Sequence, residues 1–160
     1  MTDEGLKTLV EVASRIQDSS ALEKTLGKKP TYTHRSTVRD GIGIIPIHGP
    51  TFKRANIFTE CCGASSYEII LRDLSQMLSA PEVKAILLNI DSPGGEANGC
   101  SELSDHIFEA RKVKPVFAFV GGLGASAAYW IASACTAVYA VESAFLGSIG
   151  VQSVVRSQVK

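Results

Sequence analysis

The sequence predicts an α/β protein with a largely parallel sheet, and three observations support this class. Short apolar stretches rich in β-branched residues alternate with stretches whose apolar residues recur at helical spacing. One apolar stretch, VKAILLNI at 83–90, is nearly continuous, as is typical of a strand buried on both faces of a parallel sheet. Two glycine-rich turns follow predicted strands directly, where such sheets carry their sites. Alternating strands and helices are joined by right-handed crossovers, which makes the sheet largely parallel.

The beginning of the chain predicts an arm that is separate from this sheet. Apolar residues recur at helical spacing over residues 5–17, and a second short helix is expected over 21–26. The stretch KKPTYTHRSTVRDG that follows is polar and has no sustained periodicity, which is typical of a linker. The predicted division is therefore a helical arm and linker over residues 1–40, followed by the main domain over residues 41–160. The arm is expected to serve assembly rather than the stability of the core.

The main domain begins with IGIIPIHG at 42–49, a short β-rich stretch that predicts a strand. After a loop, Ser65 and Glu68 have the spacing of a capping box, which predicts a helix with Ser65 as N-cap that stops before Pro81. The later predicted elements are, in order, the strand 83–90, the turn DSPGG, a helix from about Asn98, the strand 115–120, a glycine-rich turn, a helix that holds Ser126, and a strand over 137–141.

The charge balance argues against several classes of partner. Sixteen basic and sixteen acidic side chains give a net charge of zero. No nucleic-acid surface or anionic-membrane surface is expected from such a balance. Low net charge also weakens the repulsion between copies of a chain, which favours a homo-oligomer.

The cysteines predict neither a zinc site nor a disulfide framework. They are Cys61, Cys62, Cys100 and Cys135, and no two of them have C-x-x-C spacing. We expect reduced thiols in a cytoplasmic protein, with no metal and no cofactor. The start MTDEGLKTLVEVASRI is acidic and lacks the apolar core of a signal peptide. No apolar stretch approaches the roughly 20 residues that a membrane span needs, so no span is expected.

The stretch GGLGASAAYW places one hydroxyl at the first turn of a predicted helix. Ser126 stands a few residues past a buried strand, where backbone N–H groups have no intrahelical partner. An oxyanion formed by attack of the Ser126 hydroxyl could be held by such donors, including the N–H of Ala127. The alternative is structural: Ser126 is an N-cap, and the neighbouring alanines let the helix lie close to the sheet.

The turn DSPGG offers a second set of backbone donors. Gly94 and Gly95 can take conformations closed to other residues, which lets an N–H group point into a cleft. Asp91 could brace the turn by capping its own backbone. The alternative is an ordinary turn between a strand and a helix. Because the two turns are expected on neighbouring strands, together they favour a site with a nucleophile on one side and an oxyanion donor on the other.

Three motifs in fixed order resemble peptidase family S49. They are NIDSPGGEANG, GASAAYWIASA and AFLGSIGV, and the resemblance runs from about Gly41 to Val151. The family includes signal peptide peptidase A and the phage capsid-assembly (prohead) proteases, and IPIHG together with the stretch before DSPGG looks like the phage branch. The resemblance implies a ClpP/crotonase-like fold, a Ser/Lys dyad and an oligomer. It puts the nucleophile at Ser126 and the oxyanion turn at Gly94 or Gly95.

The function implied by this resemblance is hydrolysis of polypeptides through an acyl-enzyme on Ser126. Phage head proteins are the implied partners, and the host cytoplasm or the prohead is the implied location. In the family the general-base lysine lies several dozen residues beyond the serine. Here 160 − 126 = 34 residues follow, and Lys160 matches no such position. We therefore expect a C-terminally truncated domain with little activity of its own.

Two other functions stay open at this point. A truncated family member without a base could act as a scaffold or assembly subunit. A crotonase-like acyl-CoA enzyme would use the DSPGG turn to hold a thioester enolate and would not need Ser126, but contacts for the CoA phosphates are not evident. A Ser/His/Asp triad is disfavoured, because no histidine follows Ser126. Bases other than a distant lysine would have to come from Lys53, Lys84, Lys160, His48, His106 or a neighbouring subunit.

Overall fold

The computed structural model describes residues 35–55, 59 and 63–150. The predicted helices over 5–17 and 21–26 lie outside these residues. The strands are β1 (Thr37–Arg39), β2 (Ile42–His48), β3 (Thr51–Phe52), β4 (Ser65–Ser66), β5 (Ala85–Ser92), β6 (Val116–Ala125), β7 (Ala137–Ala140) and β8 (Phe145–Gly147). The helices within the described residues are α4 (Tyr67–Ser79), α5 (Cys100–Ala110) and α6 (Ala127–Ser133).

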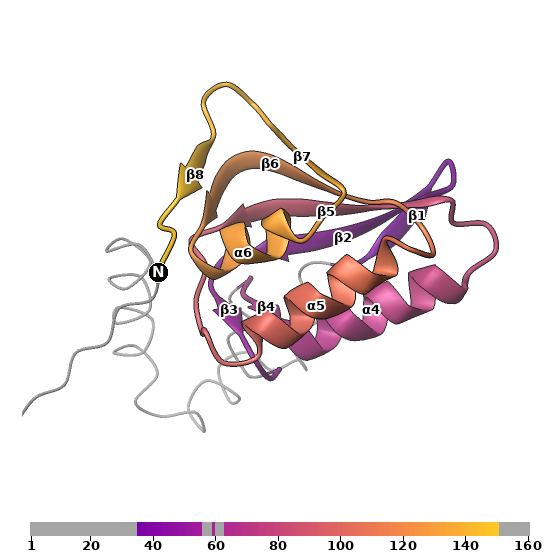
Figure 1. Ribbon diagram of the computed structural model, residues 1–160, viewed down its shortest axis with the longest axis horizontal. Helices are drawn as coiled ribbons and strands as arrows, with labels where there is room; N and C mark the ends of the chain where they lie inside the picture. Colours follow the sequence, from indigo (N-terminus) through magenta and orange to yellow (C-terminus); the bar gives the residue numbers. More distant parts are fainter. Residues whose placement is uncertain (1–34, 56–58, 60–62, 151–160) are drawn as a thin grey trace, which may run out of the picture.

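The main sheet has the strand order β1-β2-β5-β6-β7, and β8 pairs with the end of β6 (Figure 1). Strands β2, β5, β6, β7 and β8 are paired in parallel, and only the β1–β2 pair in this sheet is antiparallel. The prediction of a largely parallel α/β fold is therefore confirmed. Because the strands run the same way, the ends of β5 and β6 come out at one edge of the sheet, and both predicted site turns lie there.

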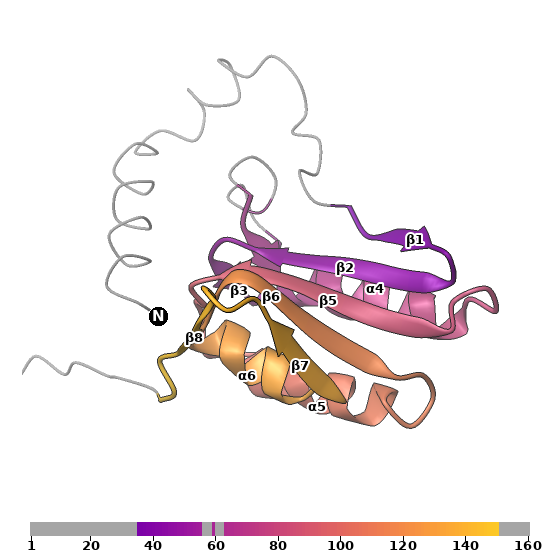
Figure 2. The same ribbon diagram turned by 90° about the horizontal axis from the view of Figure 1, so that it is seen from above.

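The three helices cover the same face of the main sheet (Figures 1 and 2). Alternate residues of β2, β5 and β6 point toward them and are fully buried, as Ile47, Leu88 and Val120 are. The other residues of β5 are partly exposed, so this strand alternates and the expectation that it is buried on both faces is wrong. No helix in the described part of the chain has the length and apolar character needed to cross a membrane.

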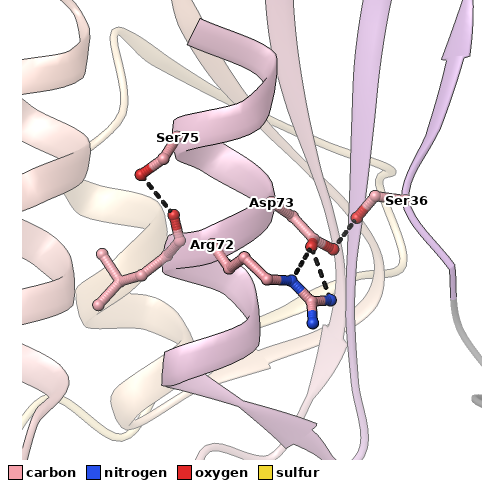
Figure 3. A network of polar contacts seen from close by, with 5 residues as sticks. Ser36, Arg72, Asp73 and Ser75 are labelled. Carbon is pink, nitrogen blue, oxygen red and sulfur yellow. Dashed lines mark hydrogen bonds and ion pairs between the residues drawn. The ribbon is translucent and has the colours of Figure 1, made fainter. Parts of the chain in front are cut away.

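The sheet begins earlier in the chain than the sequence predicted. Residues Thr37–Arg39 were expected in a linker but form β1, which pairs with β2 through a tight turn at Asp40 and Gly41. Ser36 ties this strand to α4, because its hydroxyl donates to the Asp73 carboxylate, which also accepts hydrogen bonds from the neighbouring Arg72 (Figure 3). A polar strand of three residues has too little periodicity to be distinguished from a linker by pattern alone.

Two predictions of local structure are wrong, one at the start of helix α4 and one at the end of strand β6. Ser65 is not the N-cap of α4: its hydroxyl donates to the His48 carbonyl and accepts from the His48 N–H, at 2.9 Å in each case. The N-cap is Ser66, whose side chain makes no capping hydrogen bond. The capping box therefore does not form, because tertiary contact with the end of β2 takes the Ser65 hydroxyl. The second error concerns β6, which runs on through the expected glycine-rich turn as far as Ala125.

Two buried thiols predict that the protein loses stability at alkaline pH. Burial raises the pKa of Cys100 from 9.0 to about 11 and that of Cys135 to about 12. In the unfolded chain both thiols ionise near pH 9, whereas in the folded chain they stay protonated. Above pH 9 the unfolded state therefore binds fewer protons, and the free energy of unfolding falls as pH rises through this window.

Thermal unfolding measured at intervals from pH 8 to 11 tests this expectation. The melting temperature should fall as pH rises above 9, and it should fall less steeply in Cys135→Ala and Cys100→Ala. Equal slopes in the wild type and in both variants would contradict the assignment to these thiols.

Candidate active site

Ser126 stands at a sharp junction between strand β6 and helix α6. The glycine-rich residues before it are extended, and β8 pairs with them through the register Ala125–Gly147. The Ser126 N–H donates to the Gly147 carbonyl at 3.0 Å, and its own carbonyl accepts from the Trp130 N–H at 3.0 Å. Ser126 is therefore hydrogen-bonded to strand β8 through its N–H and to the first turn of helix α6 through its carbonyl group.

The backbone of Ser126 is strained. Its φ is 55° and its ψ is −122°, in a region that residues with a side chain rarely occupy. An N-cap normally has extended backbone and a side chain bonded to the helix start, but the Ser126 side chain makes no capping hydrogen bond. The structural alternative, a simple N-cap, therefore does not account for this serine. Strained strand-to-helix turns of this kind present the nucleophile in α/β-hydrolases.

The two glycine-rich segments meet at Ser126. Gly94 has φ +83°, and a Cβ atom built on it would lie 2.8 Å from the Ser126 Cβ, 2.8 Å from the Ala127 nitrogen and 2.6 Å from the Ala125 carbonyl oxygen. The turn after β5 thus packs directly against the junction after β6. Residues 94 and 126 are brought together by the parallel pairing of β5 with β6, which places Ser92 opposite Gly124.

The backbone donors near Ser126 differ in what they already bind. The Gly94 N–H donates to the Ser92 hydroxyl at 3.1 Å, so it is already engaged. The bridge between Thr51 and the turn uses the Gly94 carbonyl and the Glu96 N–H but not the Gly95 N–H. Ala127 is the first residue of α6, where backbone N–H groups have no acceptor within the helix. Asp91 does not cap its own turn, as the sequence suggested: its carboxylate accepts a hydrogen bond from the Leu123 N–H at 3.0 Å and so joins β5 to β6.

A cavity of about 320 Å³ opens beside the serine. Its lining contains Gly95, Ala97, Ser126, Ala127, Tyr129, Trp130, Ser133, Ile149 and Gly150. The sequence pattern favoured core or interface positions for Tyr129 and Trp130, but both line this cavity, and Trp130 is 41% exposed. The lining is mainly apolar, which suits a cleft that binds part of a polypeptide.

None of the described residues that line this cavity is a lysine, a histidine or a carboxylic acid. Two of the alternative bases have other partners: Lys53 donates to the Asn98 side chain at 3.1 Å, and the His48 ring lies 3.4 Å from the Asn89 amide. Lys84 and His106 do not line it either, and Lys160 lies outside the described residues. The described residues also hold no cluster of three or more metal-ligating side chains.

Comparison with known proteins supports the resemblance to peptidase family S49 that the motifs indicate. The model of peptidase family S49 matches residues 109–156. The head-tail preconnector protein GP5 of Enterobacteria phage P21 is 36% identical over 125 residues, which cover 78% of this chain and 25% of that protein. The resemblance to family S49 is confirmed.

Two proteases extend the comparison. The capsid assembly protease C of Escherichia phage lambda is 34% identical over 122 residues, covering 76% of this chain and 28% of the relative. Protease 4 of Salmonella typhi is 38% identical over 78 residues, covering 48% and 13%. The chain thus spans about a quarter of the length of the two phage relatives.

Solved structures with the same fold are crotonase-like. An enoyl-CoA hydratase from Mycobacterium avium subsp. paratuberculosis K-10 has a TM-score of 0.55 at 23% identity, covering 74% of this chain and 48% of the other. A member of the enoyl-CoA hydratase/isomerase family has a TM-score of 0.54 at 19% identity, covering 71% and 49%. At these identities the likeness shows the fold alone, and the expected ClpP/crotonase-like fold is confirmed.

The sequence pattern did not identify a set of polar residues behind the site. Thr51, Ser92 and Tyr67 are buried around the turn that contains Gly94 and Gly95. Nothing in their spacing along the chain distinguishes them, because they belong to three different elements. The one available signal was the position of Ser92 inside the DSPGG motif.

Proposed function

We propose that this chain carries the nucleophile and oxyanion hole of an S49 serine peptidase that cleaves polypeptides through an acyl-enzyme on Ser126. The observation that carries the proposal is the strained backbone of Ser126, held against Gly94 and without a capping hydrogen bond. Backbone strain of this kind persists where the surrounding structure imposes it, and it concentrates at active sites. The resemblance to peptidase family S49 supports the reaction type, which is hydrolysis of a peptide bond.

In the proposed reaction the described residues supply the nucleophile and the oxyanion donors, and the general base comes from outside these residues. The Ser126 oxygen attacks the carbonyl carbon of the scissile peptide bond while its proton passes to the base. The carbonyl oxygen becomes an oxyanion, which the N–H groups of Gly95 and Ala127 would stabilise. Collapse of this intermediate breaks the C–N bond, and the base returns the proton to the departing amine. Water then attacks the ester by the same route and releases Ser126.

The base in this proposal is a lysine, as in a Ser/Lys dyad, supplied from outside the described residues. A lysine can serve only if its amine is neutral near pH 7, which needs burial or a cationic neighbour to lower its pKa. The cavity of about 320 Å³ has a mainly apolar lining, a setting in which a lysine amine would lose its charge. The phage relatives favour head proteins as substrates, inside the host cytoplasm or the prohead.

The direct test is to map covalent modification by a fluorophosphonate, whose fluoride leaves without a proton, so that labelling depends mainly on the position of the serine and on the oxyanion donors and less on the base. Incubation of the folded chain, followed by digestion and mass spectrometry, should give one adduct, on the peptide that contains Ser126. Ser133 serves as the internal control, because it lines the same cavity but donates its hydroxyl to the Trp130 carbonyl at 2.7 Å.

Absence of an adduct on Ser126 would contradict this proposal, and so would either of two further results. One is a heat-denatured chain that reacts as fast as the folded chain, since activation by the fold would then be absent. The other is an adduct that is spread over several serines. Either result would favour the alternative in which the chain is an inactive scaffold or assembly subunit.

A further inference from the structure

Ser92 joins the end of β2 to the turn after β5. The residue is fully buried at the end of β5. Its hydroxyl donates to the Gly49 carbonyl at 2.6 Å and accepts from the Gly94 N–H at 3.1 Å. The hydroxyl therefore both donates and accepts a hydrogen bond, and these two bonds orient the turn after β5. If the hydroxyl is removed, the Gly94 N–H and the Gly49 carbonyl lose this partner inside the protein.

Thr51 holds the next two peptide groups of the same turn. It forms an isolated parallel bridge with Gly95: the Thr51 N–H donates to the Gly94 carbonyl at 3.1 Å, and the Thr51 carbonyl accepts from the Glu96 N–H at 2.8 Å. In such a bridge the central residue turns its own N–H away from the partner strand. The Gly95 N–H therefore points away from Thr51, and Gly95 lines the cavity with Ser126.

Tyr67, the first residue of helix α4, joins the same network of hydrogen bonds. Its hydroxyl donates to the Glu96 carbonyl and lies 2.9 Å from the Thr51 hydroxyl. Because the single phenolic hydrogen goes to Glu96, the Thr51 hydroxyl is the donor in the second contact. Burial raises the pKa of Tyr67 well above its usual range, so the phenol stays a hydrogen-bond donor at physiological pH.

We propose that Ser92, Thr51 and Tyr67 are positioning residues that hold the turn 94–96 so that the Gly95 N–H faces the oxyanion beside Ser126. The inference rests on the proposed function, because it gives the turn its role in catalysis. The close packing of Gly95 supports it: a Cβ atom on Gly95 would lie 2.1 Å from the Thr51 carbonyl oxygen. The backbones of Thr51 and Gly95 are therefore in close contact, and no side chain fits at residue 95.

The variants Ser92→Ala, Thr51→Val and Tyr67→Phe each remove one hydroxyl while they keep the packing nearly unchanged. Thr51→Ser keeps the hydroxyl and is the conservative partner of Thr51→Val. The matched control is Ser65→Ala, because Ser65 is also buried and its hydroxyl also donates to and accepts from one backbone segment, at His48. Ser65 pairs with Thr51 through its backbone, which the substitution keeps, so the change removes only the hydroxyl bonds to His48.

Two readouts are measured on each variant of the whole chain. The first is amide hydrogen exchange by NMR, which should become at least about tenfold faster at Gly94 and Glu96 in Ser92→Ala and Thr51→Val, and not in Ser65→Ala. The second is the second-order rate of fluorophosphonate labelling. It should fall about tenfold or more, since loss of a whole oxyanion donor costs about 10² to 10³. Thr51→Ser should stay within about threefold of the wild-type rate.

The outcomes separate a positioning role from a structural one. If Ser65→Ala and Ser92→Ala slow labelling equally at equal loss of melting temperature, the network only stabilises the fold and the inference is wrong. If the wild type is not labelled at all, the proposed function fails, and amide exchange alone decides: faster exchange confined to residues 94–96 supports the positioning network, and unchanged exchange overturns it.

Discussion

Replacing Ser126 with alanine should lower the cleavage of an activated peptide ester by about 10² to 10³-fold, down to the rate seen without a nucleophile. An activated ester is the right substrate because its leaving group departs without a proton, so acylation depends mainly on the nucleophile and the oxyanion donors. The corresponding peptide amide should be cleaved far more slowly by this chain, because the amine must be protonated as it leaves. Release of the chromophore, followed at pH 8, measures both.

Two control variants sharpen this prediction. Ser133→Ala removes another hydroxyl of the cavity and should keep most of the ester cleavage. Ser126→Gly should abolish cleavage yet raise the free energy of unfolding by about 1 kcal/mol, because glycine occupies φ 55°, ψ −122° without steric strain. An unchanged or lower melting temperature in Ser126→Gly would show that the backbone of Ser126 is not strained. Robust amide cleavage that depends on Ser126 would place the base inside this chain.

Gly94→Val should be the most destabilising single change at the site. A Cβ atom at residue 94 would lie within 2.8 Å of three atoms around Ser126, two of which are backbone atoms, and φ at this residue is +83°. A left-handed conformation costs about 1 kcal/mol, and forced overpacking adds about 1–3 kcal/mol. We expect a loss of about 2–4 kcal/mol, or roughly 10–20 °C in melting temperature for a domain of about 100 residues. Ester cleavage should be lost as well.

Gly121→Ala is the matched glycine control, because a Cβ atom there would meet only one atom, in the Phe119 ring at 3.4 Å. Its melting temperature should stay close to that of the wild type in the same thermal scan. Gly95→Val should also be strongly destabilising, but for a different reason from the one the sequence suggested. Gly95 does not have positive φ, and the 2.1 Å approach to the Thr51 carbonyl is what excludes a side chain. A Gly94→Val protein that melts like Gly121→Ala would contradict the close contact with Ser126.

The sequence by itself determined the fold class and the resemblance to peptidase family S49. Alternating apolar and amphipathic stretches predict a parallel sheet because periodicity is a local property that each segment carries alone. The two glycine-rich motifs are also local features, and their order along the chain resembles that of family S49 independently of any tertiary contact. Ser126 and Gly95 line one cavity because both stand at the ends of parallel strands.

Only the tertiary structure decided how these residues are held. The strain at Ser126, the engagement of the Gly94 N–H by Ser92, and the bridge between Thr51 and Gly95 all depend on contacts between distant segments. Ser65 shows the same limit: its spacing to Glu68 fits a capping box, but a contact with His48 takes its hydroxyl. A hydrogen-bonding group binds whichever partner the fold brings closest, and sequence pattern records only the neighbours along the chain.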